Sequence, residues 1–425
     1  MSNNWVIEFK FILKNITMFE IGNEEEETLK INFDNKLVMF GSSLGGAIKN
    51  VLNVEDKRFL GSEEDNGESK IIISDLRGLN TEEKNLVRRP GIKINSATGA
   101  TEDKAKLLSF LVPENNEFVF YIRGEYLSDI EKSKLERIIE EIIKNINSKK
   151  IQLGANKTKG FGEFQIKDLK KLEFDLSKNK KDFFRYLILQ DNEWKSIPKN
   201  NMLKQNDYEL LEFEGIISDS ILIKGDGKMV KVNNKEDKYK QITEFYSEIN
   251  CKNNKYYTIP SSTVKGNIRS FLERIVNTMG QASFLDINLT EIFGDNEKKG
   301  KVIFYDGKIY DEKTQLYNKI KIDRFTGSAM NGALLTEERL YNLKVNINMR
   351  IEKEVLDKKD VKKLFLLYFR DLGMGKITVG SNSSVGAGRF SSGKLKMLDW
   401  EISFSSNGEI KTEENVKKEI TDLFN

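Results

Sequence analysis

The chain has 425 residues, a formal net charge of +3 at pH 7, 38% hydrophobic residues and 32% charged residues. This composition is typical of a soluble globular protein, and no run approaches the roughly 18 apolar residues of a membrane span. The first residues alternate apolar and polar side chains where a signal peptide is continuously apolar, so we expect a cytoplasmic protein without a membrane partner.

Cysteine and histidine counts restrict the chemistry. The single cysteine, Cys251, excludes an intrachain disulfide, and the absence of histidine excludes a Ser-His or Cys-His nucleophile pair. Any catalysis must then use carboxylates, lysine, tyrosine or a metal ion held by oxygen ligands.

The first half of the chain opens with a strand and a short helix. Apolar side chains alternate with polar ones over residues 5–13, which predicts a half-buried strand. Ser42 or Ser43 is expected to cap a helix that continues through Ile48 and Leu52. We expect further strands in the irregular stretch that follows.

A long helix and a glycine loop end this half. An alternating strand is predicted over residues 117–127 and a helix over 128–149, where Ser128 and Glu131 form a capping box. The glycine loop GANKTKGFGEF follows at residues 154–164 and precedes a last strand.

The second half repeats this order. We predict a strand over residues 340–351, a helix over 357–372 closed by Gly373, and a second glycine loop, GSNSSVGAGRF, over 380–390. Three more pairs of segments match in the same order, at separations of 220 to 231 residues: GSSLGGAIKNVL with SSTVKGNIRSFL, KIIISD with KVIFYD, and IKINSATGA with IKIDRFTGS. Collinear matches of this kind indicate a duplicated domain.

Each copy therefore reads strand, helix, two strands, helix, strand, which is the ferredoxin-like or RNA-recognition-motif arrangement of an α+β protein. We expect two tandem domains, each an antiparallel sheet with its helices on one face. Composition favours a first domain at residues 1–175, a lysine-rich linker at 176–207, a second domain at 208–410 and a C-terminal tail at 411–425.

The glycine loops and the helix starts predict two kinds of anion site in each copy. A glycine loop with free backbone N–H groups and nearby cations binds phosphate, and a helix start offers unpaired N–H groups and a positive dipole end. Arg324, in the repeated Thr-Gly segment, is a further candidate contact to a nucleic acid strand. The RNA-binding candidates are Ser42, Ser43, Lys49, Lys157, Thr158 and Lys159 in the first copy, and Ser262, Thr263, Lys265, Arg269, Arg324, Ser383, Ser384 and Arg389 in the second. Plain caps and turns are the alternative, and the recurrence of both motifs favours binding.

Carboxylates supply the candidate catalytic residues. Glu24–Glu27 form an acidic run between the first strand and the first helix, and the corresponding second-copy loop contains Asp237 and Glu244. Mg²⁺ needs one or two carboxylates and completes its shell with water and phosphate oxygens, so such a loop beside RNA could support hydrolysis. A solvated acidic loop is the alternative. No tightly bound cofactor is expected, and no metal ligand is assigned.

These motifs together resemble the RAMP superfamily of CRISPR-associated proteins, and within it the backbone subunits of type III effector complexes, including the fused subunits of subtype III-D. The family pattern I-P-G-S-S-L-K-G is matched by MFGSSLGGAI, which lacks the proline and the lysine, and by TIPSSTVKGNI, which lacks one glycine. The resemblance covers both halves. It implies a ferredoxin-like palm with inserted fingers and thumb that holds guide CRISPR RNA for pairing with complementary target RNA, beside other subunits of the complex.

The resemblance also bears on catalysis. Family members that cut target RNA use an aspartate ahead of the first helix, usually in an Asp-x-Pro context. The position of that aspartate, counted back from the two helix starts, falls on Glu25 in the first copy and near Glu244 in the second. Asp237 could take this position if the longer second loop folds differently. Because neither copy has Asp-x-Pro, the resemblance leaves metal-dependent endoribonuclease activity open.

Two other functions stay open from the sequence. A CRISPR RNA-processing endoribonuclease also carries a terminal glycine loop, but normally once and often with histidine, which this chain lacks. A generic tandem RNA-binding protein without catalysis would carry the RNP aromatic submotif, of the type K-G-F-G-F-V, which does not appear.

Overall fold

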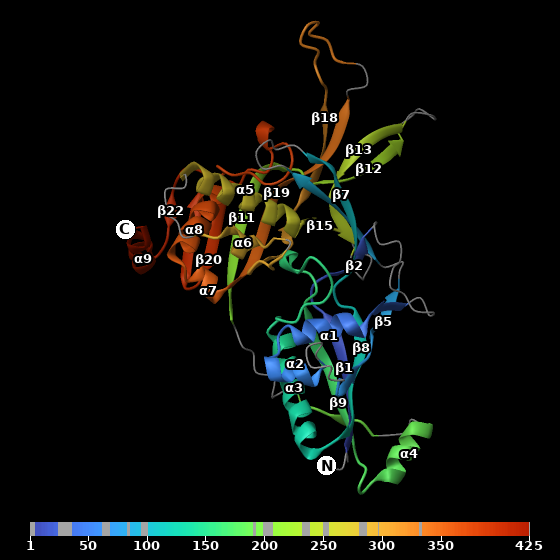
Figure 1. Cartoon of the computed structure of the whole chain (residues 1–425). Helices are drawn as coiled ribbons and strands as arrows, with labels where there is room; N and C mark the ends of the chain where they lie inside the picture. Colours follow the sequence, from blue (N-terminus) through green and yellow to red (C-terminus); the bar gives the residue numbers. More distant parts are fainter. Residues whose placement is uncertain are drawn as a thin grey trace. The chain divides into compact units, whose positions relative to one another are not determined.

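The chain divides into two compact units, of which the first contains Phe161–Asn206 and most of the chain before it, and the second contains Asp207–Asn425 (Figure 1). This computed structural model describes residues 5–23, 36–61, 69–82, 86–94, 101–189, 193–198, 207–231, 239–249, 255–279, 287–295, 297–330 and 334–424. Within these ranges no helix is both long and apolar enough to cross a membrane.

The first unit is built on an antiparallel sheet whose central strands follow the repeat predicted from the sequence. In spatial order they are β9 (Phe164–Asp175), β1 (Trp5–Asn15), β8 (Glu117–Leu127) and β4 (Ile71–Ile73). Counted by their place in the chain repeat, this is the order 4-1-3-2 of a ferredoxin-like fold. The strands β5 (Leu76–Glu82), β3 (Lys36–Met39) and β10 (Lys195–Ser196) extend the same sheet, and β2 (Phe19–Asn23), β7 (Thr101–Val112) and β6 (Val87–Ile94) form a smaller sheet.

The helices α1 (Gly41–Lys49) and α3 (Asp129–Asn147) pack on one face of this sheet. Alternate β1 residues from Ile7 to Leu13 share a single buried cluster with Leu44 of α1 and Ile142 of α3. The capping box predicted at the start of α3 is confirmed, because Ser128 and Glu131 exchange side chain to backbone hydrogen bonds.

The second unit repeats the arrangement. Its strands lie in the order β16 (Val302–Phe304), β19 (Leu335–Glu352), β11 (Tyr208–Ile221) and β20 (Ser392–Met397), and α5 (Ser261–Met279) and α8 (Lys359–Gly373) cover one face. Phe213 of β11 shares a core with Ile268 of α5 and Phe365 of α8. The duplicated ferredoxin-like fold predicted from the sequence is therefore confirmed.

Additional strands enlarge the second sheet. They are β12 (Lys224–Lys231), β13 (Tyr239–Phe245), β14 (Ser247–Ile249), β15 (Lys255–Ile259), β17 (Gly307–Tyr310), β18 (Lys313–Lys319), β21 (Trp400–Ser405) and β22 (Ile410–Lys411). β18 and the first part of β19 form a long hairpin that extends away from the helices of this unit (Figure 1).

The helix predicted over residues 357–372 begins and ends slightly differently in the structure. A short helix, α7 (Lys353–Leu356), precedes α8, and Gly373 is the last residue of α8 rather than its left-handed cap. The left-handed backbone falls on Gly375, with a φ of 70°. The left-handed residue therefore lies two positions after the last residue of α8.

The lysine-rich segment after residue 175 packs against the first unit. It forms α4 (Lys180–Leu189), whose Phe183 joins Val6, Leu172 and Phe174 on the sheet face opposite α1 and α3. The structure thus assigns this segment to the first unit rather than to a linker between the domains. At the C-terminus, α9 (Glu414–Phe424) packs through Val416 into the core of the second unit.

Candidate nucleic-acid interface

The two glycine loops fold alike, as their shared sequence pattern predicts. Each contains a 3-10 turn, formed by Lys157–Lys159 in the first loop and by Ser383–Val385 in the second. The asparagine before each turn has a left-handed backbone, with φ of 53° at Asn156 and 64° at Asn382. Each loop therefore has a defined backbone conformation that recurs in the two copies.

The last loop glycines are required by close packing. Gly162 and Gly388 have φ of 79° and 76°, and in each a Cβ atom would lie 1.9 Å from a backbone carbonyl oxygen. Their N–H groups donate to the carbonyls of Met18 and Ser220, at 2.8 and 2.7 Å. The N–H groups of these two glycines are therefore not free to bind an anion, because they hold each loop against Met18, which follows β1, or Ser220, near the end of β11.

A buried carboxylate fixes the asparagine of each loop. The Asn156 amide donates to the carboxylate of Glu20, and the Asn382 amide donates to Glu337 at 3.0 Å. Burial opposes ionisation of Glu337, but hydrogen bonds from Arg339 and other donors lower its pKa to about 2. Sequence reasoning missed both carboxylates, because they lie far from the loops along the chain.

The loop side chains differ in exposure. Ser383, Ser384 and Arg389 are exposed in the second loop, so their polar groups can reach a ligand. Lys157, Thr158 and Lys159 are half-buried in the first, and burial lowers the pKa of Lys157. The first loop is the more basic in sequence, but the second presents its side chains more openly.

Aspartates from the short connections after β4 and β16 complete the helix starts. The first N–H of α1, at Gly41, donates to Asp75 Oδ1 at 2.8 Å, and the first N–H of α5, at Ser261, donates to Asp306 Oδ1 at 2.7 Å. These two aspartates end the matched segments KIIISD and KVIFYD. Both copies of the repeat thus keep an aspartate that accepts the first N–H of the helix, a role that the sequence alone did not reveal.

The serines predicted as caps lie inside the first helical turn. The N-cap of α1 is Phe40, which makes no side-chain cap hydrogen bond, so the prediction that Ser42 or Ser43 caps this helix is wrong. Ser42, Ser43 and Ser262 are exposed and Thr263 is partly exposed. The aspartate charge partly offsets the helix dipole, so anion binding here would depend mainly on the hydroxyl groups.

Lysines of the two helices make equivalent contacts. Lys49 Nζ donates to the carbonyl of Gly61, which follows the short helix α2 (Val54–Phe59), at 2.8 Å. Lys265 Nζ donates at 2.8 Å to the carbonyl of Phe293, the last residue of α6 (Leu289–Phe293). Burial, with the charge of Arg269 adding to it, lowers the pKa of Lys265 to about 8. Arg269 itself forms an ion pair with Glu273 at 2.7 Å.

In the second unit the structure joins the helix start to the base of the glycine loop. Asn267 Nδ2, next to the repeated glycine of α5, donates to the carbonyl of Thr378 at 2.9 Å. Tyr368 of α8 donates to Asn267 Oδ1 at 2.8 Å. These hydrogen bonds hold the start of α5 beside the base of the glycine loop, although the two are more than a hundred positions apart in sequence.

The Thr-Gly segment of the second copy forms the tip of the β18–β19 hairpin. Asp323 Oδ1 accepts the N–H groups of Phe325 and Thr326 at 2.9 and 2.8 Å, which makes an ordered turn. Arg324 is exposed, and the Phe325 side chain is 99% exposed. Sequence reasoning singled out Arg324 and missed Phe325, although an aromatic residue within a polar turn is a usable signal. The equivalent tip in the first copy, at 95–100, lies outside the described residues.

Two of the three candidate catalytic carboxylates, Glu25 and Asp237, lie outside the described residues. Glu244 is on β13 and is half-buried. Within the described part of the chain, no group of three or more histidine, cysteine, aspartate or glutamate residues could hold a metal ion. Cleavage therefore stays a prediction.

Comparisons with known proteins give one family. A family model described as the RAMP superfamily matches residues 14–165 and 246–391, which together make up more than half of the chain. No curated protein matches the sequence. Among solved structures, a chain of the type III-B Cmr-beta complex bound to cognate target RNA is similar over 41% of this chain and 62% of its own length, with 13% identity and a TM-score of 0.31. The chain therefore spans less than two thirds of that relative, and a TM-score of this size does not establish a shared fold.

Proposed function

Because the chain belongs to the RAMP superfamily, we propose that it is a backbone subunit of a type III CRISPR ribonucleoprotein that holds guide RNA for pairing with complementary target RNA. Other subunits of such a complex would be its protein partners. The observation that carries the proposal is the duplicated pair of glycine loop and helix start, which has the same backbone geometry in both units. Two equivalent sites suit a repeating ligand such as the phosphate backbone of one RNA strand.

The second unit offers the clearest contacts for RNA. Exposed hydroxyl and cationic groups from the loop can bind phosphate oxygens, and Arg324 and Phe325 at the hairpin tip can stack on a base. Guide sequence would be read by base pairing, since these groups contact backbone or any base face. Sequence specificity is therefore not expected of the protein itself.

The sheet faces disfavour a generic RNA-recognition-motif mode. That mode stacks bases on aromatic residues of the two central strands. In the second unit these strands carry Glu212, Glu214 and Asn346 on the face opposite the helices, and in the first unit Tyr121 lies against Trp194, with ring centroids 6.3 Å apart. Loops, helix starts and the hairpin are thus better candidates than the sheet faces.

Charge reversal tests the binding proposal. Lys157→Glu with Lys159→Glu should weaken binding of single-stranded RNA about tenfold or more and reduce the salt dependence, measured by fluorescence anisotropy on RNA-depleted protein. Lys417→Glu with Lys418→Glu on α9 makes the same change in net charge and should bind normally. Equal weakening by both variants would contradict a localised site.

Target RNA cleavage is a separate part of the proposal. The assembled complex, given complementary RNA and Mg²⁺, should cut at regular intervals if Glu25, Asp237 or Glu244 binds a metal ion beside the scissile phosphate. Cuts that persist in all three alanine variants would show that other residues act. Absence of cuts, with guide and target RNA bound, would favour a subunit that only holds RNA.

A further inference from the structure

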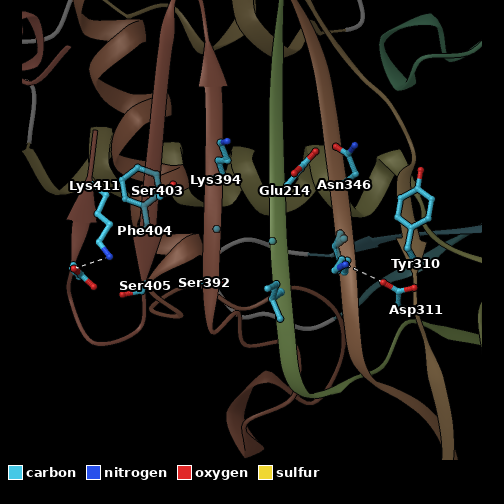
Figure 2. A pocket seen from close by; sticks show the side chains of 16 residues that line it. Glu214, Tyr310, Asp311, Asn346, Ser392, Lys394, Ser403, Phe404, Ser405 and Lys411 are labelled. Carbon is cyan, nitrogen blue, oxygen red and sulfur yellow. Dashed lines mark ion pairs between the residues drawn. The ribbon is translucent and has the colours of Figure 1, made fainter. Parts of the chain in front are cut away.

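The hollow on the sheet face of the second unit opposite its helices has balanced charges. Figure 2 shows this hollow, whose charged lining consists of three lysines and three carboxylates: Lys344, Lys394, Lys411, Glu214, Asp311 and Glu409. Lys394 lies directly opposite Glu214 in the register of the sheet. Lys344 pairs with Asp311 at 3.2 Å (Figure 2). The hollow therefore does not select a ligand by charge.

A buried cluster of charges lies at the base of the β18–β19 hairpin instead. Glu337 and Arg339, on the same face of β19, are only 6% and 5% exposed and pair at 2.8 Å. Lys319 of β18 also pairs with Glu337, at 2.9 Å, and the Arg339 guanidinium lies over the ring of Tyr317 on β18. Because a buried charge is costly unless it is paired, these groups fix one another in position.

The same cluster holds both ends of the second glycine loop. Glu337 accepts the amide of Asn382, which precedes the 3-10 turn of the loop, at 3.0 Å. Arg339 donates to the hydroxyl of Ser220 at 3.2 Å, and the Ser220 carbonyl accepts the N–H of Gly388, near the other end of the loop, at 2.7 Å. One carboxylate and one arginine therefore attach the hairpin to the loop at both ends.

The first unit makes a corresponding attachment with different residues. Glu20 accepts hydrogen bonds from Asn156 of its glycine loop and, at 2.8 Å, from Ser109 of β7. Arg89 of β6, which is 6% exposed, lies over the ring of Phe161 in the same loop, 5.1 Å from its centroid. β6 and β7 pair with each other and flank the Thr-Gly segment of this copy in sequence. A buried carboxylate and a buried arginine thus again join paired strands to the loop.

The two copies place the carboxylate on different strands. A Cβ atom on Gly154 would lie 2.5 Å from the Glu20 carbonyl oxygen. The equivalent Cβ atom on Gly380 would lie 2.5 Å from the Leu222 carbonyl oxygen, so Leu222 takes the place of Glu20 in the second unit. The buried Leu222 side chain cannot accept a hydrogen bond, and Glu337 of β19 supplies the carboxylate there. The contact to the loop asparagine thus recurs without a shared sequence position, which points to a role for the contact itself.

These buried pairs are named the clamps: Glu20 with Arg89 in the first unit, and Glu337 with Arg339 in the second. We propose that the clamp residues are positioning residues that lock each hairpin to its glycine loop, so that the two bind one RNA strand as a single preformed element. The inference rests on the proposed RNA-binding function. A locked element loses little freedom on binding, so the hairpin tip with Phe325 and the loop with Arg389 each contribute their full contact.

Hydrogen exchange of the RNA-free protein tests the lock. Asn382→Gly removes the amide that Glu337 holds, while glycine suits the left-handed backbone at this position, φ 64°, and Glu337 keeps its ion pairs. Mass spectrometry should show exchange that is about tenfold faster in β18 and the first part of β19 as well as in the loop. Asn342→Gly, at an exposed asparagine of β19 with φ 54°, is the matched control and should leave the exchange of β18 and the loop unchanged. In the first unit, Asn156→Gly should speed the exchange of β7 in the same way.

The affinity for a labelled oligouridylate tests the consequence for binding. Phe325→Ala should weaken binding about tenfold in the wild-type background but about threefold or less in the Asn382→Gly background, because an unlocked tip contributes less. Hairpin exchange that is unchanged in Asn382→Gly, or raised equally by Asn342→Gly, would overturn the inference. So would an equal cost of Phe325→Ala in both backgrounds. Wild-type protein that does not bind oligouridylate, while Asn382→Gly still speeds hairpin exchange, would contradict the proposed function and uphold the lock.

Discussion

The glycine loop of the second unit allows a sharp test of why its glycines are needed. Gly386 and Gly388 both have left-handed backbones, with φ of 87° and 76°, but only Gly388 is crowded. In Gly388→Ala the Cβ atom would lie 1.9 Å from the Val379 carbonyl oxygen, whereas in Gly386→Ala nothing lies within 4 Å of the Cβ atom. The two variants therefore separate backbone strain from close packing.

The expected costs follow from these contacts. Left-handed strain destabilises either alanine variant by about 1–2 kcal/mol. In Gly388→Ala the neighbouring backbone segments must also move apart. This breaks the hydrogen bond from the Gly388 N–H to the Ser220 carbonyl, 2.7 Å long, and the one from the Val379 N–H to the Gly388 carbonyl, 3.0 Å long. Two lost buried hydrogen bonds raise its total cost to about 3–6 kcal/mol.

Chemical denaturation should measure this difference in the free energy of unfolding. Trp400 belongs to the core of the second unit, so its fluorescence reports that unit when Trp5 and Trp194 are replaced by phenylalanine. We expect Gly388→Ala to lower the transition midpoint far more than Gly386→Ala. Equal midpoints for the two variants would refute the close-packing argument.

Three further predictions concern individual groups of the second unit. Asp306→Ala should lower the free energy of unfolding by about 1–2 kcal/mol in the same assay because it removes the acceptor of the Ser261 N–H, and an Asn variant that costs as much would contradict this capping role. Because burial lowers the pKa of Lys265 to about 8, RNA affinity should fall as pH rises from 7 to 9, where the ammonium group loses its proton. Lys265→Arg stays protonated and should flatten this pH dependence in anisotropy titrations; an unchanged profile would show that Lys265 does not bind phosphate. Phe325→Ala should leave the melting temperature unchanged, since the side chain is 99% exposed, yet weaken RNA binding about tenfold through lost stacking; unaltered affinity would remove the hairpin tip from the interface.

The parts of the fold that the sequence predicts are those with local or repeated signals. β1 and β8 alternate apolar and polar residues, and the capping box of Ser128 and Glu131 spans three residues, so each can be recognised within a short window. The duplicated fold follows from collinear matches between the halves. These features do not depend on contacts between distant parts of the chain.

The missed features depend on contacts between distant residues. Asp75 caps Gly41 from 34 positions away, and Asp306 caps Ser261 from 45 positions away. Local sequence patterns contain neither contact, so they pointed to the nearest serines as the helix caps. The lysine-rich composition after residue 175 likewise suggested a linker, because composition does not show that Phe183 of α4 packs on the sheet.

The loop motifs show a different limit of sequence reasoning. Glycines that bind phosphate and glycines that allow close packing have the same sequence pattern, and only the position of the neighbouring carbonyl distinguishes them. The structure gives Gly162 and Gly388 a packing role. It leaves the exposed side chains of the second loop, Ser383, Ser384 and Arg389, as the groups that can contact a ligand.

The RNA that co-purifies with the native complex tests the central claim most directly. Extraction and sequencing of that RNA should yield a discrete population of defined length and defined ends, and the Lys157→Glu, Lys159→Glu variant should carry less of it. Protein recovered without RNA, with no affinity for guide RNA at low salt, would contradict the account.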